Sequence, residues 1–241
     1  MKKALTLSTL LASLAAAAFF GAPAAQAQTA ASAPATAAAA SGPSPAASPR
    51  AADKLVAMCI GCHNIPGYQA SFPEVHKVPM IAGQSAKYIV SALNAYKKGD
   101  RKHPTMRGIA QSLSDQDMND IASYYEQLAA KAGEPAKLPD TLQVPADVQA
   151  LLTKGACVSC HGANLNKPLD PSYPKLAGQY SDYLYVALKA YQVEKNPHVG
   201  RSNPIMAAQA KQFSHAELKT LANYIGSLPS ELKTVPQSRF R

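Results

Sequence analysis

Apolar side chains at a spacing of three or four residues mark most of the chain after residue 53. This spacing predicts one helix over 85–98 and another over 180–194. The apolar face of the first helix consists of Tyr88, Ile89, Ala92 and Tyr96. No stretch shows the strict alternation that is typical of a half-buried strand. The pattern therefore predicts an all-α fold.

Two later helices are predicted from the signals at their first residues. Ser114 is followed three positions later by Asp117, and Ser214 by Glu217, which is the spacing of a capping box. The second of these helices has an apolar face formed by Leu218, Leu221, Ala222, Ile225 and Leu228. One helix is thus expected to begin at Ser114 and a second at Ser214.

The predicted helices belong to two copies of one sequence unit. Residues 79–84 (PMIAGQ) match residues 174–179 (PKLAGQ) at an offset of 95. Residues 104–106 match residues 204–206 at an offset of 100, because the second copy carries five extra residues. Self-similarity at a fixed offset indicates a repeated structural unit. We therefore expect a tandem pair of domains.

Segments of different composition flank the two copies. Residues 133–145 contain several prolines and are predicted to form a linker, and residues 231–241 a C-terminal tail. The domains are then residues 53–132 and 146–230. Residues 28–52 are almost entirely Ala, Pro, Ser, Gln and Thr, a composition that predicts a disordered segment.

The start of the chain has the three regions of a secretory signal peptide. Lys2 and Lys3 are positive, residues 4–20 are apolar, and residues 25–27 (Ala-Gln-Ala) form a small-residue cleavage site. The apolar run of 17 residues is short for a membrane span, which needs about 20. We expect residues 1–27 to be cleaved during export. An uncleaved membrane anchor is the alternative.

All four cysteines lie in two copies of the pattern C-x-x-C-H. Two thiols three positions apart lie on neighbouring rungs of one helical turn, so they can reach the two vinyl groups on one edge of a haem. The histidine that follows can then ligate the iron. The pattern predicts two covalently bound haems c, each with one iron. This agrees with the export that the signal peptide predicts. The predicted attachment residues are Cys59, Cys62 and His63 in the first copy, and Cys157, Cys160 and His161 in the second.

Other uses of these cysteines fit the spacing less well. A single zinc site would need the two pairs roughly 15–20 residues apart, whereas 98 positions separate Cys59 from Cys157. A thioredoxin-type pair needs a βαβ context, which the pattern does not show. Two disulfides could form in an oxidising compartment, but they would not require His63 and His161. A haem would also supply part of the core that a domain of about 80 residues lacks.

A methionine at the same place in both copies is the predicted sixth ligand of each iron. Met206 is the only methionine of the second copy, and only Met106 among those of the first has a counterpart there. A thioether ligand raises the reduction potential of haem iron, which suits an electron carrier. His103 and His198 lie close to these methionines and are the alternative ligands. They would give bis-histidine ligation and a lower potential.

Together these motifs resemble the dihaem cytochrome c4 family. The resemblance covers about residues 53–230 and rests on C-x-x-C-H, P-x-x-A-G-Q, P-x-M and S-x-x-[DE], each present twice. It implies two class I cytochrome c domains related by a pseudo-twofold axis, with the haem propionate edges facing each other across the interface. It also implies electron transfer in the periplasm, commonly to a terminal oxidase. By position it assigns His63 and Met106 to one iron, and His161 and Met206 to the other.

The leading hypothesis is a soluble periplasmic electron carrier without catalytic chemistry. The net charge of +9 becomes +7 without Lys2 and Lys3. A basic cluster between Lys97 and Arg107 would favour docking onto an acidic face of a redox partner, such as a terminal oxidase, a quinol-oxidising complex or a dehydrogenase. A solvated lysine face is the alternative for this cluster. Nucleic acid is not an expected partner of an exported haem protein.

Two other functions remain open at this point. Dihaem proteins of similar layout act as peroxidases or as sulfur-compound oxidoreductases, which need one iron with an open position and nearby acid and base groups. The methionine in both copies favours the carrier. A fixed subunit of a membrane complex, with peripheral membrane association, is the second alternative, and only the basic cluster and the anchor reading of the N-terminus favour it.

Overall fold

The computed structural model describes residues 54–134 and 137–237. The predicted signal peptide (1–27) and the Ala/Pro-rich segment (28–52) lie outside these residues. The described part is mostly helical, and each of its strands is two residues long. This confirms the all-α prediction. No helix in the described ranges is long and apolar enough to cross a membrane.

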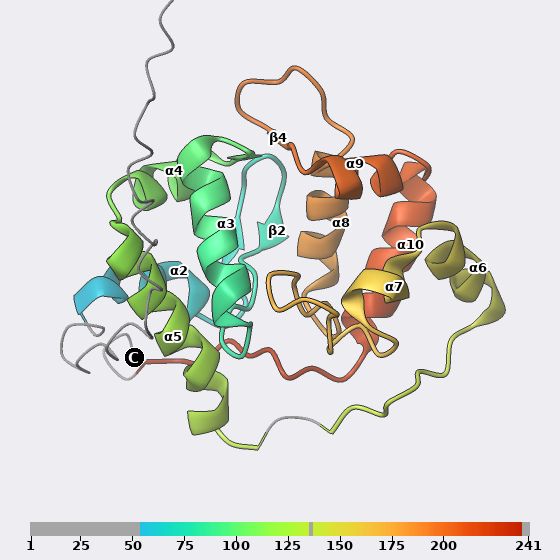
Figure 1. Ribbon diagram of the computed structural model, residues 1–241, viewed down its shortest axis with the longest axis horizontal. Coiled ribbons are helices and arrows are strands. Elements are labelled where there is room, and N and C mark those ends of the chain that lie inside the picture. The colour runs from blue at the N-terminus through green and yellow to red at the C-terminus, as the bar shows by residue number, and fades with distance from the viewer. Residues whose placement is uncertain (1–53, 135–136, 238–241) are drawn as a thin grey trace, which may run out of the picture. The chain divides into compact units, whose positions relative to one another are not determined.

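Within the described residues, the two sequence copies give similar series of elements, except that the pair β1–β2 occurs only in the first (Figure 1). The first copy contains α2 (Ala57–His63), β1 (Gln69–Ala70), β2 (His76–Lys77), α3 (Ala86–Lys98), β3 (Arg101–Lys102), α4 (Pro104–Gln111) and α5 (Asp115–Lys131). The second contains α6 (Ala146–Lys154), α7 (Cys157–His161), α8 (Ser181–Ala190), β4 (Gly200–Arg201), α9 (Pro204–Ala210) and α10 (His215–Ser227). Strands β1 and β2 pair antiparallel within the first copy, and β3 pairs antiparallel with β4 of the second.

Each copy has its own hydrophobic core, so the copies are two domains. In the first, α3 packs against α5, and in the second α8 packs against α10 (Figure 1). The first core is built on Val56, Ile60, Ala82, Ile89, Leu93, Met118, Ile121, Ala122, Tyr125, Leu128 and Ala129. The second is built on Val148, Leu152, Leu165, Ala177, Leu184, Phe213, Leu218, Leu221, Ala222 and Ile225.

The predicted helix starts at Ser114 and Ser214 are confirmed. The Ser114 hydroxyl accepts a hydrogen bond from the main-chain N–H of Asp117, whose carboxylate accepts from the N–H of Ser114. Ser214 and Glu217 make the same reciprocal pair at the start of α10. Both capping boxes leave the apolar faces of α5 and α10 turned toward their domain cores.

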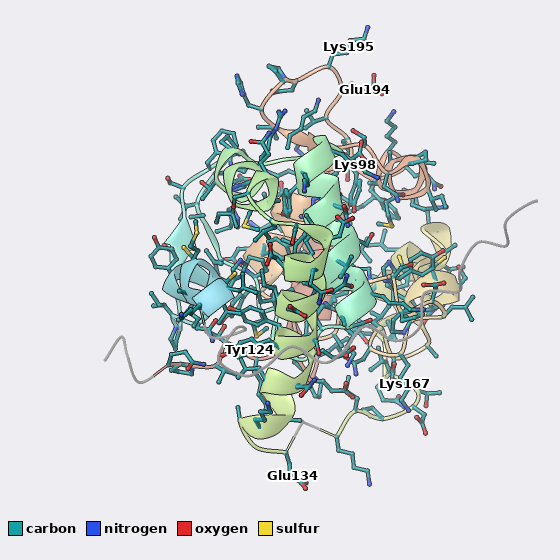
Figure 2. The ribbon with its side chains drawn as sticks, turned by 60° about the vertical axis from the view of Figure 1, so that its left-hand side comes forward. Lys98, Tyr124, Glu134, Lys167, Glu194 and Lys195 are labelled. Atoms are coloured by element: carbon teal, nitrogen blue, oxygen red, sulfur yellow. The ribbon has the colours of Figure 1, made fainter. Side chains whose placement is uncertain are left out.

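The predicted helix over 180–194 is wrong at its end. Helix α8 stops at Ala190, and the next turns are held by tighter contacts, in which Val193 N–H donates to the carbonyl of Ala190. The Gln192 side chain donates to two carbonyls near the end of α9, which draws the chain away from the helix axis. The loop that follows holds the extra residues of the second copy, and Glu194 and Lys195 project from it (Figure 2).

The glycine of each A-G-Q run lies against the last helix of its own domain. Gly83 N–H donates to the carbonyl of Tyr125, and Gly178 N–H donates to that of Ile225. Gly83 has a φ of 85°, and a Cβ there would lie 2.6 Å from the carbonyl oxygen of Glu231. Only glycine therefore permits this close approach.

Residues 231–237, which we name the C-terminal strap, return from α10 to the first domain (Figure 1). Lys233 N–H donates to the carbonyl of Ala82 at 3.0 Å and forms an isolated β-bridge there. Val235 packs against the first core, and its carbonyl accepts a 2.6 Å hydrogen bond from Asn64 Nδ2. The strap is therefore part of the packing of the first domain.

Candidate haem-binding sites

The first C-x-x-C-H run lies on α2. Cys59 and Cys62 are free, half-buried thiols. Burial raises the pKa of Cys59 to about 11, so this thiol is protonated at neutral pH. Because neither sulfur is held in a disulfide, both are available for thioether bonds to haem vinyl groups.

The second run lies on α7 and also carries two free thiols. Ala156, with a φ of 45°, separates α7 from α6, so the attachment residues begin a short helix of their own. Burial raises the pKa of Cys157 above its ordinary value. Helix α6 ends at Lys154, before the first cysteine of the motif.

A proline carbonyl orients each predicted proximal histidine. His63 Nδ1 lies 2.9 Å from the carbonyl oxygen of Pro79, and His161 Nδ1 lies 3.0 Å from that of Pro174. Since a carbonyl can only accept, Nδ1 carries the proton and Nε2 keeps its lone pair for a metal. Burial lowers the pKa of both histidines, which favours the neutral imidazole that iron requires.

Each predicted methionine ligand lies in the first turn of a short capped helix. Met106 N–H donates to Nδ1 of His103 (3.4 Å) at the start of α4, and Met206 N–H donates to Oδ1 of Asn203 (3.0 Å) at the start of α9. Both methionines are half-buried. A capping side chain followed by proline at the first helical position starts each of these helices. His103 thus takes the capping role of Asn203.

The other methionines and the second candidate histidine lie in different surroundings. Met118 is fully buried in the first core, and the Met58 side chain is 63% exposed. Met80 is buried where the two domains meet. His198 is exposed. The assignment of Met106 and Met206 to iron stays a prediction.

Two arginines that sequence reasoning did not single out face each other between the domains. The antiparallel pairing of β3 with β4 places Arg101 opposite Arg201. Each guanidinium lies over two tyrosine rings of its own domain and donates to one of their hydroxyls. The ring centroids are 5.3 Å (Tyr88) and 5.7 Å (Tyr96) from Arg101 Cζ, and 5.7 Å (Tyr183) and 5.5 Å (Tyr191) from Arg201 Cζ. The hydroxyl contacts are 3.2 Å to Tyr88 and 3.1 Å to Tyr183.

The surroundings of this arginine pair show whether the interface suits the carboxylates of a haem. Within the residues that the structure describes, neither guanidinium forms an ion pair with a carboxylate. Like charges opposite each other in a ladder are unfavourable, and partly buried charges need a counter-charge. The carboxylates of haem propionates would supply it. The repetition of Arg101 at 201, with tyrosines repeated before it, was the sequence signal for this pair.

The basic cluster between Lys97 and Arg107 is not a continuous exposed rim. Lys97 Nζ donates to the carbonyl of Leu113, Arg101 faces the interface, and Lys102 Nζ donates to the carbonyl of Asn196 in the other domain. Lys98, at the end of α3 (Figure 2), and Arg107 are the exposed members. A docking face built from this cluster would therefore have two cations rather than five.

Comparison with known proteins agrees with this geometry. The sequence model of the cytochrome c family matches the chain twice, over residues 50–129 and 145–229. Cytochrome c4 from Stutzerimonas stutzeri is 27% identical over 194 residues, which cover 76% of this chain and 90% of that protein. A thiosulfate dehydrogenase electron acceptor from Thiomonas intermedia is 28% identical over 193 residues, covering 76% and 84%.

The fold is also similar to that of a solved structure. The crystal structure of reduced recombinant cytochrome c4 from Pseudomonas stutzeri superimposes with a TM-score of 0.54 at 27% identity, and the match covers 76% of this chain and all of that one. The two family matches correspond to the two hydrophobic cores, each with one C-x-x-C-H run. The chain therefore belongs to the cytochrome c family, as a tandem of two cytochrome c domains that each bind one haem c.

Proposed function

We propose that this protein carries electrons between redox partners in the periplasm, with each iron ligated by one histidine and one methionine. The observation that carries the proposal is the repetition of one arrangement in both domains. In each, a proline carbonyl holds the histidine Nδ1 and a capped first turn carries the methionine. When bound, each haem would supply a one-electron ferric–ferrous couple.

The chain's own residues would hold and insulate the two haems. Cys59 and Cys62 would anchor the first covalently, and Cys157 and Cys160 the second. Arg101 and Arg201 would neutralise propionates where the domains meet, which supports an arrangement with the two propionate edges close together. Burial of each porphyrin in the core of its own domain and a thioether ligand both favour a high reduction potential.

A carrier fits these sites better than an enzyme does. A peroxidase or sulfur-compound oxidoreductase needs one iron with an open position. Here the methionine-bearing turn is built in the same way in both domains, by a capping side chain and a proline, so both irons are expected to be six-coordinate.

Two kinds of partner follow from this function. The cleavable signal predicted at residues 1–27 supports export, so donor and acceptor would be periplasmic or membrane-bound proteins such as a quinol-oxidising complex and a terminal oxidase. The similarity to proteins named as thiosulfate dehydrogenase electron acceptors supports a dehydrogenase as an alternative donor. Reduction rates measured with each donor would separate the two. A rate that falls as the salt concentration rises would indicate docking onto an acidic face.

The ligand assignment is tested with single methionine variants of the holoprotein. Met106→Ala and Met206→Ala should each leave two haems per chain, remove the thioether signature of one iron from the magnetic circular dichroism spectrum, and lower one potential. Met58→Ala, at an exposed site, is the control and should change neither. Unchanged spectra in both ligand variants would overturn the assignment, and an open iron in the unsubstituted protein would favour the enzyme.

A further inference from the structure

The glutamine of each P-x-x-A-G-Q run binds the main chain of the opposite domain. Gln179 Oε1 accepts from Met80 N–H (3.0 Å), and Gln179 Nε2 donates to the Met80 carbonyl (2.8 Å). Gln84 makes the same pair with Lys175, at 2.8 Å and 3.0 Å. Both glutamines are buried, with 2% (Gln84) and 4% (Gln179) of their surface exposed. Each amide thus satisfies both polar groups of one residue across the interface.

One of the two contacts of each glutamine ends on a peptide group that also holds a predicted proximal histidine. The N–H of Met80 belongs to the same peptide group as the carbonyl of Pro79, and that carbonyl accepts from His63 Nδ1. A continuous series of hydrogen bonds therefore runs from Gln179 in the second domain to His63 in the first. The reciprocal series consists of Gln84, Lys175 N–H, the Pro174 carbonyl and His161.

Hydrogen bonds in such a series polarise one another. A peptide N–H that donates to a glutamine oxygen makes the carbonyl of the same peptide more negative, and that carbonyl becomes a better acceptor for the imidazole N–H. A stronger acceptor at Nδ1 raises the basicity of Nε2. A more basic imidazole stabilises ferric iron relative to ferrous iron, and so lowers the reduction potential.

We propose that Gln179 and Gln84 are positioning residues for the proximal histidine of the opposite domain, so that contact between the domains sets the potential of each haem. The inference rests on the proposed function, because His63 and His161 must be iron ligands. Several other polar contacts between the domains end elsewhere: Lys102 reaches the Asn196 carbonyl, Asp182 accepts from Lys77, Ser202 N–H donates to the Asp100 carbonyl, and Lys189 pairs with Glu74.

The test uses Gln179→Met and Gln84→Met in the full-length holoprotein. Methionine has a similar length but removes both hydrogen bonds. The two potentials are measured by following haem methyl NMR signals, assigned to each haem, through a potentiometric series. The Nδ1–H proton shifts of both proximal histidines are measured in the reduced protein, where they report the strength of the hydrogen bond to proline.

A crossed pattern is expected. Gln179→Met should raise the potential of the first-domain haem and move the His63 Nδ1–H signal upfield, with the second domain unchanged. Gln84→Met should do the same to the second-domain haem and His161. Gln192→Met is the matched control, because it removes an amide that binds carbonyls only within its own domain. It should leave the His63 signal unchanged.

Any other pattern overturns the inference: a shift confined to the variant's own domain, an equal shift of both haems, or no shift. If a methionine variant fails to incorporate two haems, Gln179→Asn and Gln84→Asn replace it, since asparagine is one methylene too short to keep both contacts. A failure of the proposed function is recognised separately, because the unsubstituted protein would then lack two histidine–methionine haems. Two such haems with uncrossed shifts would refute only the role of the glutamines.

Discussion

Replacing Tyr125 with phenylalanine is expected to destabilise the first domain by about 1–3 kcal/mol, because it leaves a buried acceptor unpaired. Tyr125 is fully buried, and its hydroxyl donates to Asn64 Oδ1 at 2.8 Å. Burial raises the pKa of Tyr125 well above its ordinary value, so the hydroxyl stays a donor. Asn64 is itself 3% exposed and donates to the Val235 carbonyl of the strap.

The magnitude follows from what the substitution leaves in place. Phenylalanine keeps the ring and its packing in the first core, so little apolar burial is lost. The change removes one hydrogen bond and leaves Asn64 Oδ1 without a donor in a site that water does not reach. For a protein of this size, each kcal/mol corresponds to about 2–4 °C in Tm. The second domain has Ile225 and Gly162 at the corresponding positions, so it should be unaffected.

The assay is guanidinium unfolding of the holoprotein, with each domain followed by amide hydrogen exchange. A double-mutant cycle with Asn64→Ala should show a coupling of about 0.5–1.5 kcal/mol, because both single changes remove the same bond. Tyr224→Phe is the control: its hydroxyl makes only an exposed contact with the Gln143 carbonyl, so the change should stay within about 0.5 kcal/mol. Additive effects of Tyr125→Phe and Asn64→Ala would refute the reasoning.

Three further changes test the strap, a glycine and a cap. Deleting the C-terminal strap should destabilise the first domain by roughly 2 kcal/mol or more, through lost apolar burial, and hydrogen exchange that speeds equally in both domains would contradict this. Gly178→Ala should cost at least about 1–2 kcal/mol, since Gly178 has a φ of 68° and its Cβ would lie 2.4 Å from Ser230 Cβ. Gly108→Ala, in open helical space, should be neutral or stabilising in the same melting assay. Hydrogen bonds from Lys154 and Ser214 lower the pKa of Glu217 from 4.5 to about 2. Its stabilisation is therefore complete above pH 4.5 and is lost as the pH falls through 4.5 toward about 2, and Glu217→Gln should abolish this part of the pH dependence of unfolding.

Features that depend on neighbouring residues in the chain were predictable from the sequence. The capping boxes at Ser114 and Ser214 use side chains three positions apart, so local spacing was enough to place the starts of α5 and α10. The apolar face of α3 predicted a helix over 85–98, which agrees with the observed Ala86–Lys98; Gly99, with a φ of 86°, ends it. The repeat of cysteines and histidines likewise identified the two attachment sites without any tertiary information.

Features that depend on distant residues were not predictable. Helix α8 ends early because the Gln192 side chain binds carbonyls about twenty positions away. Arg101 was grouped with neighbouring lysines because its charge is visible in the sequence, whereas its pairing with Arg201 requires β3 and β4 to meet. The amide contacts of Gln84 and Gln179 also span more than ninety positions. Repetition indicated that these residues matter, but only the fold shows which groups they bind.

The contacts between the domains are self-complementary, as in an isologous dimer. Each domain supplies a glutamine that binds the other's main chain, and β3 lies beside β4 with one arginine on each. One set of residues, duplicated, therefore serves both sides of the interface. Because the same residue types at equivalent positions form both sides of the interface, duplication of one domain is enough to give a matched pair of haem sites.

The segments that follow the last helix of each domain also make reciprocal contacts, each with the other domain. The strap after α10 packs on the first core through Val235 and accepts from Asn64 Nδ2, and the segment after α5 packs on the second core through Leu138 and accepts from Asn164 Nδ2 at its Pro139 carbonyl. Residues 137–145 are therefore a cover for the second domain as well as a connection to it. Because each domain is completed by a segment that follows the other, neither sequence copy alone contains all of its own packing, and the stability of each haem site depends on the whole tandem.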